Sequence, residues 1–298
     1  MSANDPAKFR KFSFRRVGAI TTNTLTELTR QKVFYVLLIF ALILIGSSVF
    51  MARFTFQQEF QILKDISLGA MSIFSSLLAI VATARLISQD VEDRTIYTIL
   101  AKPVPRFEYI VGKLGGVILL LAISVAIMAV LFAGMLYFRE QIVLSQTARE
   151  MSRAPQEQMN DALHAIRVAG LNADIFLGVT VIFIKACLLA ALTLLVSTFA
   201  TTNIFTITVM AFVYLIGHLQ ATAREYWLQQ PHAGWVARGF LALIALIFPD
   251  LQAFNLVDEI VAGTSVPLAL FTKTALLGLF YIVIYTVTAI FVFYGKEL

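Results

Sequence analysis

The chain has 298 residues, of which 59% are hydrophobic and 14% charged, and its net charge is +5 at pH 7. Soluble domains carry about 25% charged residues, so this composition excludes a soluble globule and equally a disordered chain. The single cysteine, Cys187, excludes an internal disulfide framework. Long continuous apolar tracts, instead of short alternating strands, predict an all-α integral membrane protein.

Residues 13–32 precede the first apolar tract and show a two-sided pattern. On a helical wheel, apolar side chains share one sector and basic side chains lie opposite; they are Phe14, Val17, Leu25 and Leu28 against Arg15, Arg16 and Arg30. A basic amphipathic helix of this kind typically lies in the membrane interface. We therefore expect an interfacial helix over 13–32, with an ordinary solvated leader helix as the alternative.

Six apolar tracts are long enough to cross a bilayer, which takes about 20 helical residues. We expect these transmembrane helices at about 33–51, 66–85, 110–138, 174–200, 204–220 and 268–294. Lys and Arg are about twice as dense in the segments that lie on the side of the two termini, so the positive-inside rule predicts an N-in, C-in orientation. We expect all six spans to form one transmembrane domain over 1–298.

The loop over 86–109 joins the second and third spans on the cytoplasmic side. Acidic residues at its front and Lys102 followed by Pro103 at its back suit a helix dipole, which predicts a helix over 89–102. Pro103 and Pro105 then predict an extended corner. A helix this short is marginal alone in water, so it needs a packing surface. That surface is either the protein's own helices or a cytoplasmic partner.

Two extracytoplasmic segments are neither spans nor plain loops. Residues 139–172 predict a helical hairpin that continues the third span, because Met159, Leu163 and Ile166 recur at helical spacing in its second half. Residues 234–262 contain an apolar stretch that is too short to cross the bilayer. We expect short re-entrant helices there, before the last span.

The chain lacks the motifs of common catalytic and metal sites. Gly112-Lys113 is the nearest fragment to a P-loop, but Phe107 stands where the first glycine belongs and Leu114 replaces the Ser or Thr. The three histidines fall in different segments, so no metal site is expected. We expect no catalytic residue and no enzyme activity in this chain alone. The sequence contains no basic patch with interleaved aromatic residues, so it does not predict nucleic-acid binding.

Lys185 lies near the middle of the fourth expected span. A lysine at that depth costs about 2.5–3.5 kcal/mol on insertion scales unless it snorkels or faces a cavity. Lys185 is therefore a candidate residue of a translocation path; alternatively, backbone carbonyls or a helix partner satisfy it. No carboxylate lies near the centre of a span, which argues against a proton- or sodium-driven transporter.

The sequence from Asp90 to Lys113 resembles the signature loop of ABC-2 type transporter permeases. It has an acidic-basic-Thr helix, a Lys-Pro-Val corner at 102–104, an Arg, an aromatic-acid pair and a Gly-Lys. Residues 28–33, 249–258 and 294–298 resemble the same family at the first span, before the sixth span and at the tail. The matches occur in the expected order along nearly the whole chain.

The resemblance implies a six-helix permease half in the bacterial cytoplasmic (inner) membrane, with an interfacial helix and a coupling helix. It implies pairing with a second permease subunit, as a homodimer or heterodimer, and docking on two separate ATP-binding cassette subunits. Those subunits would bind ATP and Mg, and this chain would hold no cofactor. Nine loop residues would form or flank the ATPase contact: Asp90, Glu92, Asp93, Arg94, Thr95, Tyr97, Lys102, Pro103 and Arg106.

The function we expect is the permease of an ATP-driven exporter. One alternative is a membrane scaffold of the same fold that anchors an extracytoplasmic maturation or motility complex, with 139–172 as its docking surface. The other is an ion-coupled secondary transporter. The sequence selects no cargo.

Overall fold

The computed structural model describes residues 13–53, 59–92, 105–152, 155–200, 202–229, 249–262 and 266–295. Within these ranges every regular element is a helix, and six helices are long and apolar enough to cross a membrane. The predicted fold class, an all-α membrane protein with six spans, is confirmed.

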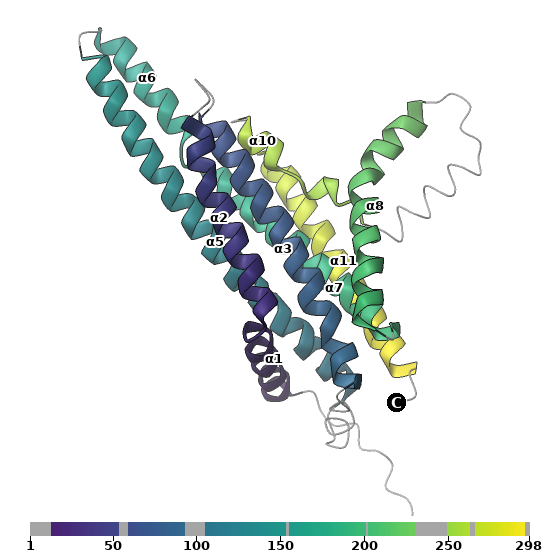
Figure 1. Cartoon of the computed structure of the whole chain (residues 1–298). Helices are drawn as coiled ribbons and strands as arrows, with labels where there is room; N and C mark the ends of the chain where they lie inside the picture. Colours follow the sequence, from purple (N-terminus) through teal and green to yellow (C-terminus); the bar gives the residue numbers. More distant parts are fainter. Residues whose placement is uncertain are drawn as a thin grey trace, which may run out of the picture.

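The six long helices form one bundle, with α8 at its edge (Figure 1). They are α2 (Lys32–Arg53), α3 (Glu59–Glu92), α5 (Arg106–Glu150), α7 (Ala173–Phe199), α8 (Asn203–Gln229) and α11 (Leu268–Gly295). The central helix is α7, which packs against α3, α5 and α11 and is the most buried of the six. Its sequence is apolar on all sides, as a helix enclosed by other helices requires.

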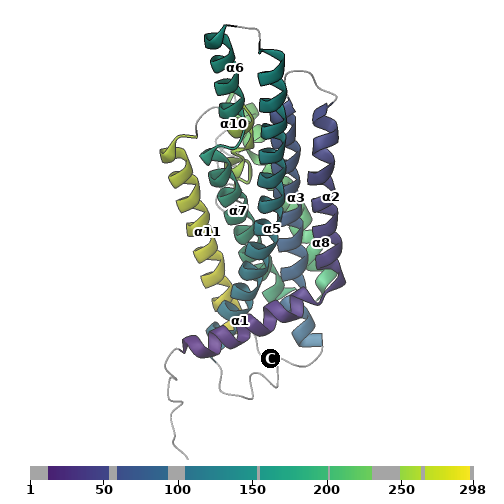
Figure 2. The ribbon, with the colours of Figure 1, turned by 90° about the vertical axis from the view of Figure 1, so that its left-hand side faces the viewer.

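Helix α1 (Phe14–Thr29) lies across one end of the bundle, where the C-terminal end of α11 also lies (Figure 2). We call this the cytoplasmic end, following the charge pattern. The close approach of α1 to α5 depends on Gly112 and Gly116, because a Cβ at residue 116 would lie 2.6 Å from the Thr24 Cβ. The packed face of α1 includes Thr24 and Leu28, whereas Phe14 of the expected apolar sector is 83% exposed.

Three helices continue beyond the expected ends of their spans. Helix α3 runs to Glu92 instead of ending at 85, α8 runs to Gln229 instead of 220, and α5 runs past 138 to Glu150, into the expected hairpin. The expected loop helix therefore does not begin at Gln89, since Asp90 and Glu92 form part of the last turn of α3. Acidic side chains are favourable at the N-terminus of a helix and unfavourable at its C-terminus. The acidic cluster therefore predicted the start of a helix, although Asp90 and Glu92 lie at the end of one. The remainder of the expected loop helix, 93–102, lies outside the described residues.

Helices α5 and α6 (Gln156–Ala169) form a hairpin that projects beyond the other helices (Figure 1). At its base the Leu171 amide donates to the Glu140 carboxylate at 3.3 Å, and the Arg139 Nε donates to Glu59 of α3 at 3.1 Å. No residue of α6 is buried. The hairpin occupies the segment 139–172, where the sequence led us to expect one.

Two short helices, η1 (Gln252–Phe254) and α10 (Val257–Val261), pack against the long helices ahead of α11. The Leu251 amide donates to the Gly217 carbonyl of α8 at 3.0 Å. Gly217 makes this approach possible, because a Cβ there would lie 2.7 Å from the Leu251 Cγ. These helices occupy the end of the expected re-entrant segment 234–262, of which 234–248 lies outside the described residues.

Candidate functional site

The first two turns of α5, residues 106–113, begin in the last residues of the predicted coupling loop (86–109) and lead into the third span; we call them the α5 junction. Pro105 precedes the helix with φ −59° and ψ 138°, so the chain enters α5 from an extended corner, as proline favours. A displacement of the loop reaches the bundle either through this junction or through the end of α3. The contacts of the junction therefore decide which helices would follow the loop.

The junction is bound to α1 through a buried carboxylate. Glu108 accepts hydrogen bonds from Arg16, at 2.7 Å from Nε to Oε2 and at 2.8 Å from Nη2 to Oε1, and from the Ser13 amide at 3.0 Å. This bidentate pairing is the strong form of a charge-assisted bond. Glu108 precedes the uncharged membrane-crossing stretch of α5, and the Arg16 guanidinium holds its pKa below the usual range of a glutamate. A second pair, Lys113 with Glu27 at 3.6 Å, adds to the contact.

The junction is also bound to the last turn of α11. Arg106 Nη1 donates to the Phe293 and Tyr294 carbonyls at 3.2 and 2.8 Å. Carbonyls at a helix C-terminus lack partners within the helix and attract cations, so Arg106 acts as a C-terminal cap for α11. The ring of Tyr109 stacks on the ring of Phe293 at 5.7 Å. The exit of the loop is therefore attached to α1 and α11 together.

The structure describes one side chain among the nine predicted loop residues, that of Arg106, which contacts α11. The backbones of Asp90 and Glu92 end α3, and six residues lie outside the described ranges: Asp93, Arg94, Thr95, Tyr97, Lys102 and Pro103. Sequence reasoning missed Arg16 and Glu108 as functional candidates. The aromatic-acid pair of the loop signature, which contains Glu108, was the available signal.

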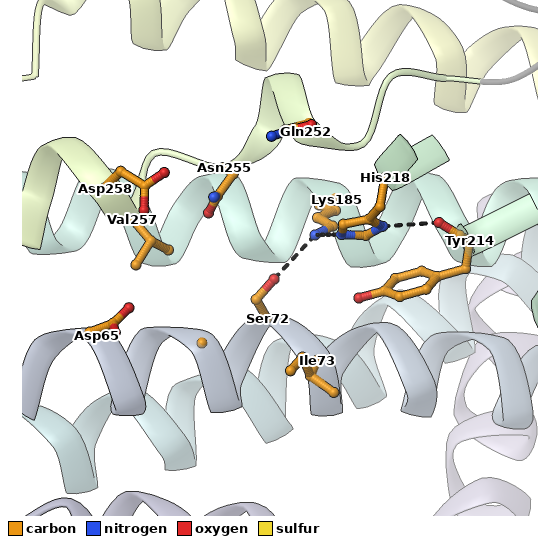
Figure 3. A pocket seen from close by; sticks show the side chains of 11 residues that line it. Asp65, Ser72, Ile73, Lys185, Tyr214, His218, Gln252, Asn255, Val257 and Asp258 are labelled. Atoms are coloured by element: carbon orange, nitrogen blue, oxygen red, sulfur yellow. Dashed lines mark hydrogen bonds between the residues drawn. The ribbon is translucent and has the colours of Figure 1, made fainter. Parts of the chain in front are cut away.

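The second candidate site surrounds Lys185 on α7 (Figure 3). The side chain is buried, and its Nζ lies 3.2 Å from Ser72 Oγ on α3 and 3.2 Å from His218 Nε2 on α8. His218 Nδ1 lies 2.9 Å from the Tyr214 carbonyl, which can only accept, so Nδ1 carries the proton. In the neutral ring Nε2 then accepts a hydrogen bond from Lys185. Two of the three N–H groups of Lys185 thus have acceptors on neighbouring helices.

Lys185 also lines a pocket of about 480 Å³ between α3, α7, α8, η1 and α10; we call it the Lys185 pocket. Lys185 and His218 lie at one end, and Asp65 and Asp258 lie at the other (Figure 3). Sequence reasoning identified Lys185 alone, because its neighbours come from four other segments. Among the described residues, no three His, Cys, Asp or Glu side chains are grouped as a metal site.

A bundle of six apolar helices, with a helix across one end and short helices packed at the other, defines a multi-pass α-helical membrane protein. The sequence profile of the ABC-2 family transporter proteins matches residues 18–298. The chain therefore belongs to the ABC-2 transporter family, as its loop signature predicted. The family consists of membrane subunits of ABC transporters, which are generally non-catalytic and associate with an ABC ATPase. No curated protein gives a significant match to the chain.

Proposed function

We propose that this chain is the permease subunit of an ATP-driven exporter in a bacterial cytoplasmic membrane. In this proposal, the loop over 86–109 docks on two separate ATPase subunits, which bind ATP and Mg, and a second permease subunit completes the path. The α5 junction is the observation that supports it. Arg106 and Glu108 fasten the exit of the loop to α11 and α1, so a displacement of the loop would move three helices together instead of being absorbed locally.

The chain needs an external source of energy for such a movement. Its sequence has no P-loop, and 7 of the 24 residues of the loop over 86–109 are charged. Charged side chains of both signs, such as Glu92 and Arg94, suit a polar docking surface better than an apolar packing contact. We therefore assign them to the ATPase interface.

The test is co-purification of this chain from its native membrane, identification of the ABC ATPase bound to it, and measurement of ATP hydrolysis by the complex. Glu92→Lys and Arg94→Glu reverse loop charges; Glu150→Lys and Arg149→Glu, in the exposed last turn of α5 at the far end of the bundle, are matched controls. We expect the loop variants to lose about tenfold or more of the bound ATPase, the equivalent of 1.4 kcal/mol. Full binding and activity in both loop variants would refute the proposal.

The projecting hairpin favours one second function, a scaffold for an extracytoplasmic complex. Helix α6 buries no residue, and most of its side chains are exposed and accessible to a partner. Replacing 143–167 with a short Gly-Ser turn keeps the Glu140–Leu171 contact at the base. A permease would keep its ATPase coupling without the hairpin, whereas a scaffold would lose its extracytoplasmic partners.

A further inference from the structure

We propose that the Lys185 pocket binds a small zwitterionic molecule, with an anionic group at Lys185 and an ammonium group at Asp65 and Asp258. The inference rests on the proposed function in one respect only, that a bound molecule would be the cargo of the permease. Binding itself requires no ATPase.

The inner end of the pocket is suited to an anion. Lys185 is 3% exposed and forms no ion pair with any carboxylate of the described residues. Ser72 and His218 accept two of its three N–H groups, which leaves one donor for a ligand. A buried cation without a counter-ion is costly, so an anionic group placed beside it is strongly favoured.

The outer end of the pocket is suited to a cation. Asp65 on α3 and Asp258 on α10 are exposed, and neither forms an ion pair with a residue whose position is described. These carboxylates repel a simple anion that enters the pocket, whereas they attract an ammonium group. The two ends together select a molecule that carries both charges.

The dimensions of the pocket fit a small ligand. Its volume of about 480 Å³ falls in the usual range of ligand pockets. Asp65 precedes Ser72 by seven residues on α3, a rise of about 10 Å. Between them Gly69 leaves the wall open, since a Cβ there would meet nothing within 4 Å. The exposed amide of Asn255 lies along the same pocket and can both donate and accept.

Two sources could supply this chemistry: a water-soluble amino acid or peptide, or an ethanolamine lipid headgroup. Triglycine represents the first source, because three extended residues span about 10 Å, close to the rise between Asp65 and Ser72 along α3. Its N-acetyl form retains only the carboxylate, and its C-terminal amide retains only the ammonium. Lysophosphatidylethanolamine represents the second source, with anionic lysophosphatidylglycerol as its control.

The experiment is calorimetric titration of the purified full-length chain in maltoside detergent with each of these five probes. We expect at least one zwitterion to bind about tenfold more tightly than its singly charged counterparts. Selective binding of triglycine identifies a soluble ligand, and selective binding of lysophosphatidylethanolamine identifies a lipid. If neither zwitterion binds, or if N-acetyltriglycine and lysophosphatidylglycerol bind as tightly as the zwitterions, the inference is wrong.

Variants test the two ends separately. Lys185→Met should abolish binding, and Asp65→Asn with Asp258→Asn should reduce zwitterion affinity to that of the anion-only probe. Lys273→Met and Asp161→Asn, exposed and outside the pocket, are matched controls expected to bind normally.

If Lys185→Met does not fold, the substitutions at Asp65 and Asp258 still decide the question, since both side chains are exposed. A retained preference for the zwitterion in that double variant overturns the inference. Because the titration contains no ATPase, its failure leaves the proposed coupling intact, and a failure of coupling leaves the titration interpretable.

Discussion

The carboxylate of Glu108 is fully buried but ionic, and α1 supplies its partners. Removing Arg16 leaves that charge buried beside a single amide, which is more costly than removing both charges. We predict that Arg16→Met lowers the thermal unfolding midpoint of the purified protein and that adding Glu108→Gln recovers part of the loss. Arg15→Met, at an exposed neighbouring position, should have little effect. Equal effects of the Arg15 and Arg16 substitutions would contradict this account.

The same pair predicts a pH dependence. Arg16 lowers the pKa of Glu108 in the folded state, so the pair stabilises the fold at neutral pH and loses its effect as the pH falls through the acidic range. We expect the difference in unfolding midpoint between wild type and Glu108→Gln to be constant around neutral pH and to shrink as the pH falls below about 4, the ordinary pKa of a glutamate, towards the lower pKa of Glu108 in the folded state. If the difference in unfolding midpoint grows on acidification, the pKa of Glu108 is raised in the folded state and the account of this pair is wrong.

Arg106 gives a prediction about coupling. Its hydrogen bonds to the Phe293 and Tyr294 carbonyls are charge-assisted, a class worth about 1.5–3 kcal/mol each when intact. In the complex with its ATPase, Arg106→Ala should retain the bound subunit but lose permease-dependent stimulation of hydrolysis by about tenfold, with Arg106→Lys intermediate. Arg85→Ala, near the end of α3, is the control. If Arg106→Ala stimulates ATP hydrolysis as strongly as wild type, the contact between Arg106 and α11 has no role in coupling.

The sequence points to individual candidate residues but does not predict which residues contact each other. Lys185 is evident because a charge stands out within a long apolar tract. Its partners Ser72 and His218 are 113 and 33 residues away along the chain, and Arg16 is 92 residues from Glu108. No periodicity connects positions so far apart, so these contacts could be found only in three dimensions.

At the scale of elements, the close packing of α1 on α5 depends on small residues of α5. A larger side chain at Gly116 would overlap Thr24, and overpacking of this kind costs about 1–3 kcal/mol. We predict that Gly116→Leu lowers the unfolding midpoint. Gly134→Leu on the same helix should not, because a Cβ at 134 meets nothing within 4 Å. If both substitutions are equally tolerated, α1 does not pack closely against α5 at Gly116.

Hydropathy places the spans but not the helix ends. The apolar requirement stops where the bilayer stops, whereas a helix can continue into water, as α3 does to Glu92 and α5 does to Glu150. The amphipathic pattern of residues 13–32 predicted a helix, and Leu28 of its apolar sector is buried, but the pattern did not predict the burial of Thr24. The packed face of α1 is set by the glycines of α5, which accept Thr24 where a wheel diagram favours the largest apolar residues.

At the scale of the whole molecule, α5 joins the two ends of the protein. Its 45 residues are about 68 Å long, more than twice the thickness of the hydrocarbon core. One helix therefore runs from the α5 junction at the cytoplasmic end to the hairpin with α6 at the other (Figure 1). A tilt imposed at the junction would be carried to the hairpin, which gives the permease and scaffold proposals a shared mechanical basis.

The most direct test is site-specific photo-crosslinking in membranes that contain this chain and the ABC ATPase that co-purifies with it. Benzoylphenylalanine replaces Tyr97 in the coupling loop or, as the control, Met159 on the hairpin helix α6. The account predicts a crosslink to the ATPase from position 97 and none from position 159. A crosslink from position 97 only to this chain's own helices would contradict it.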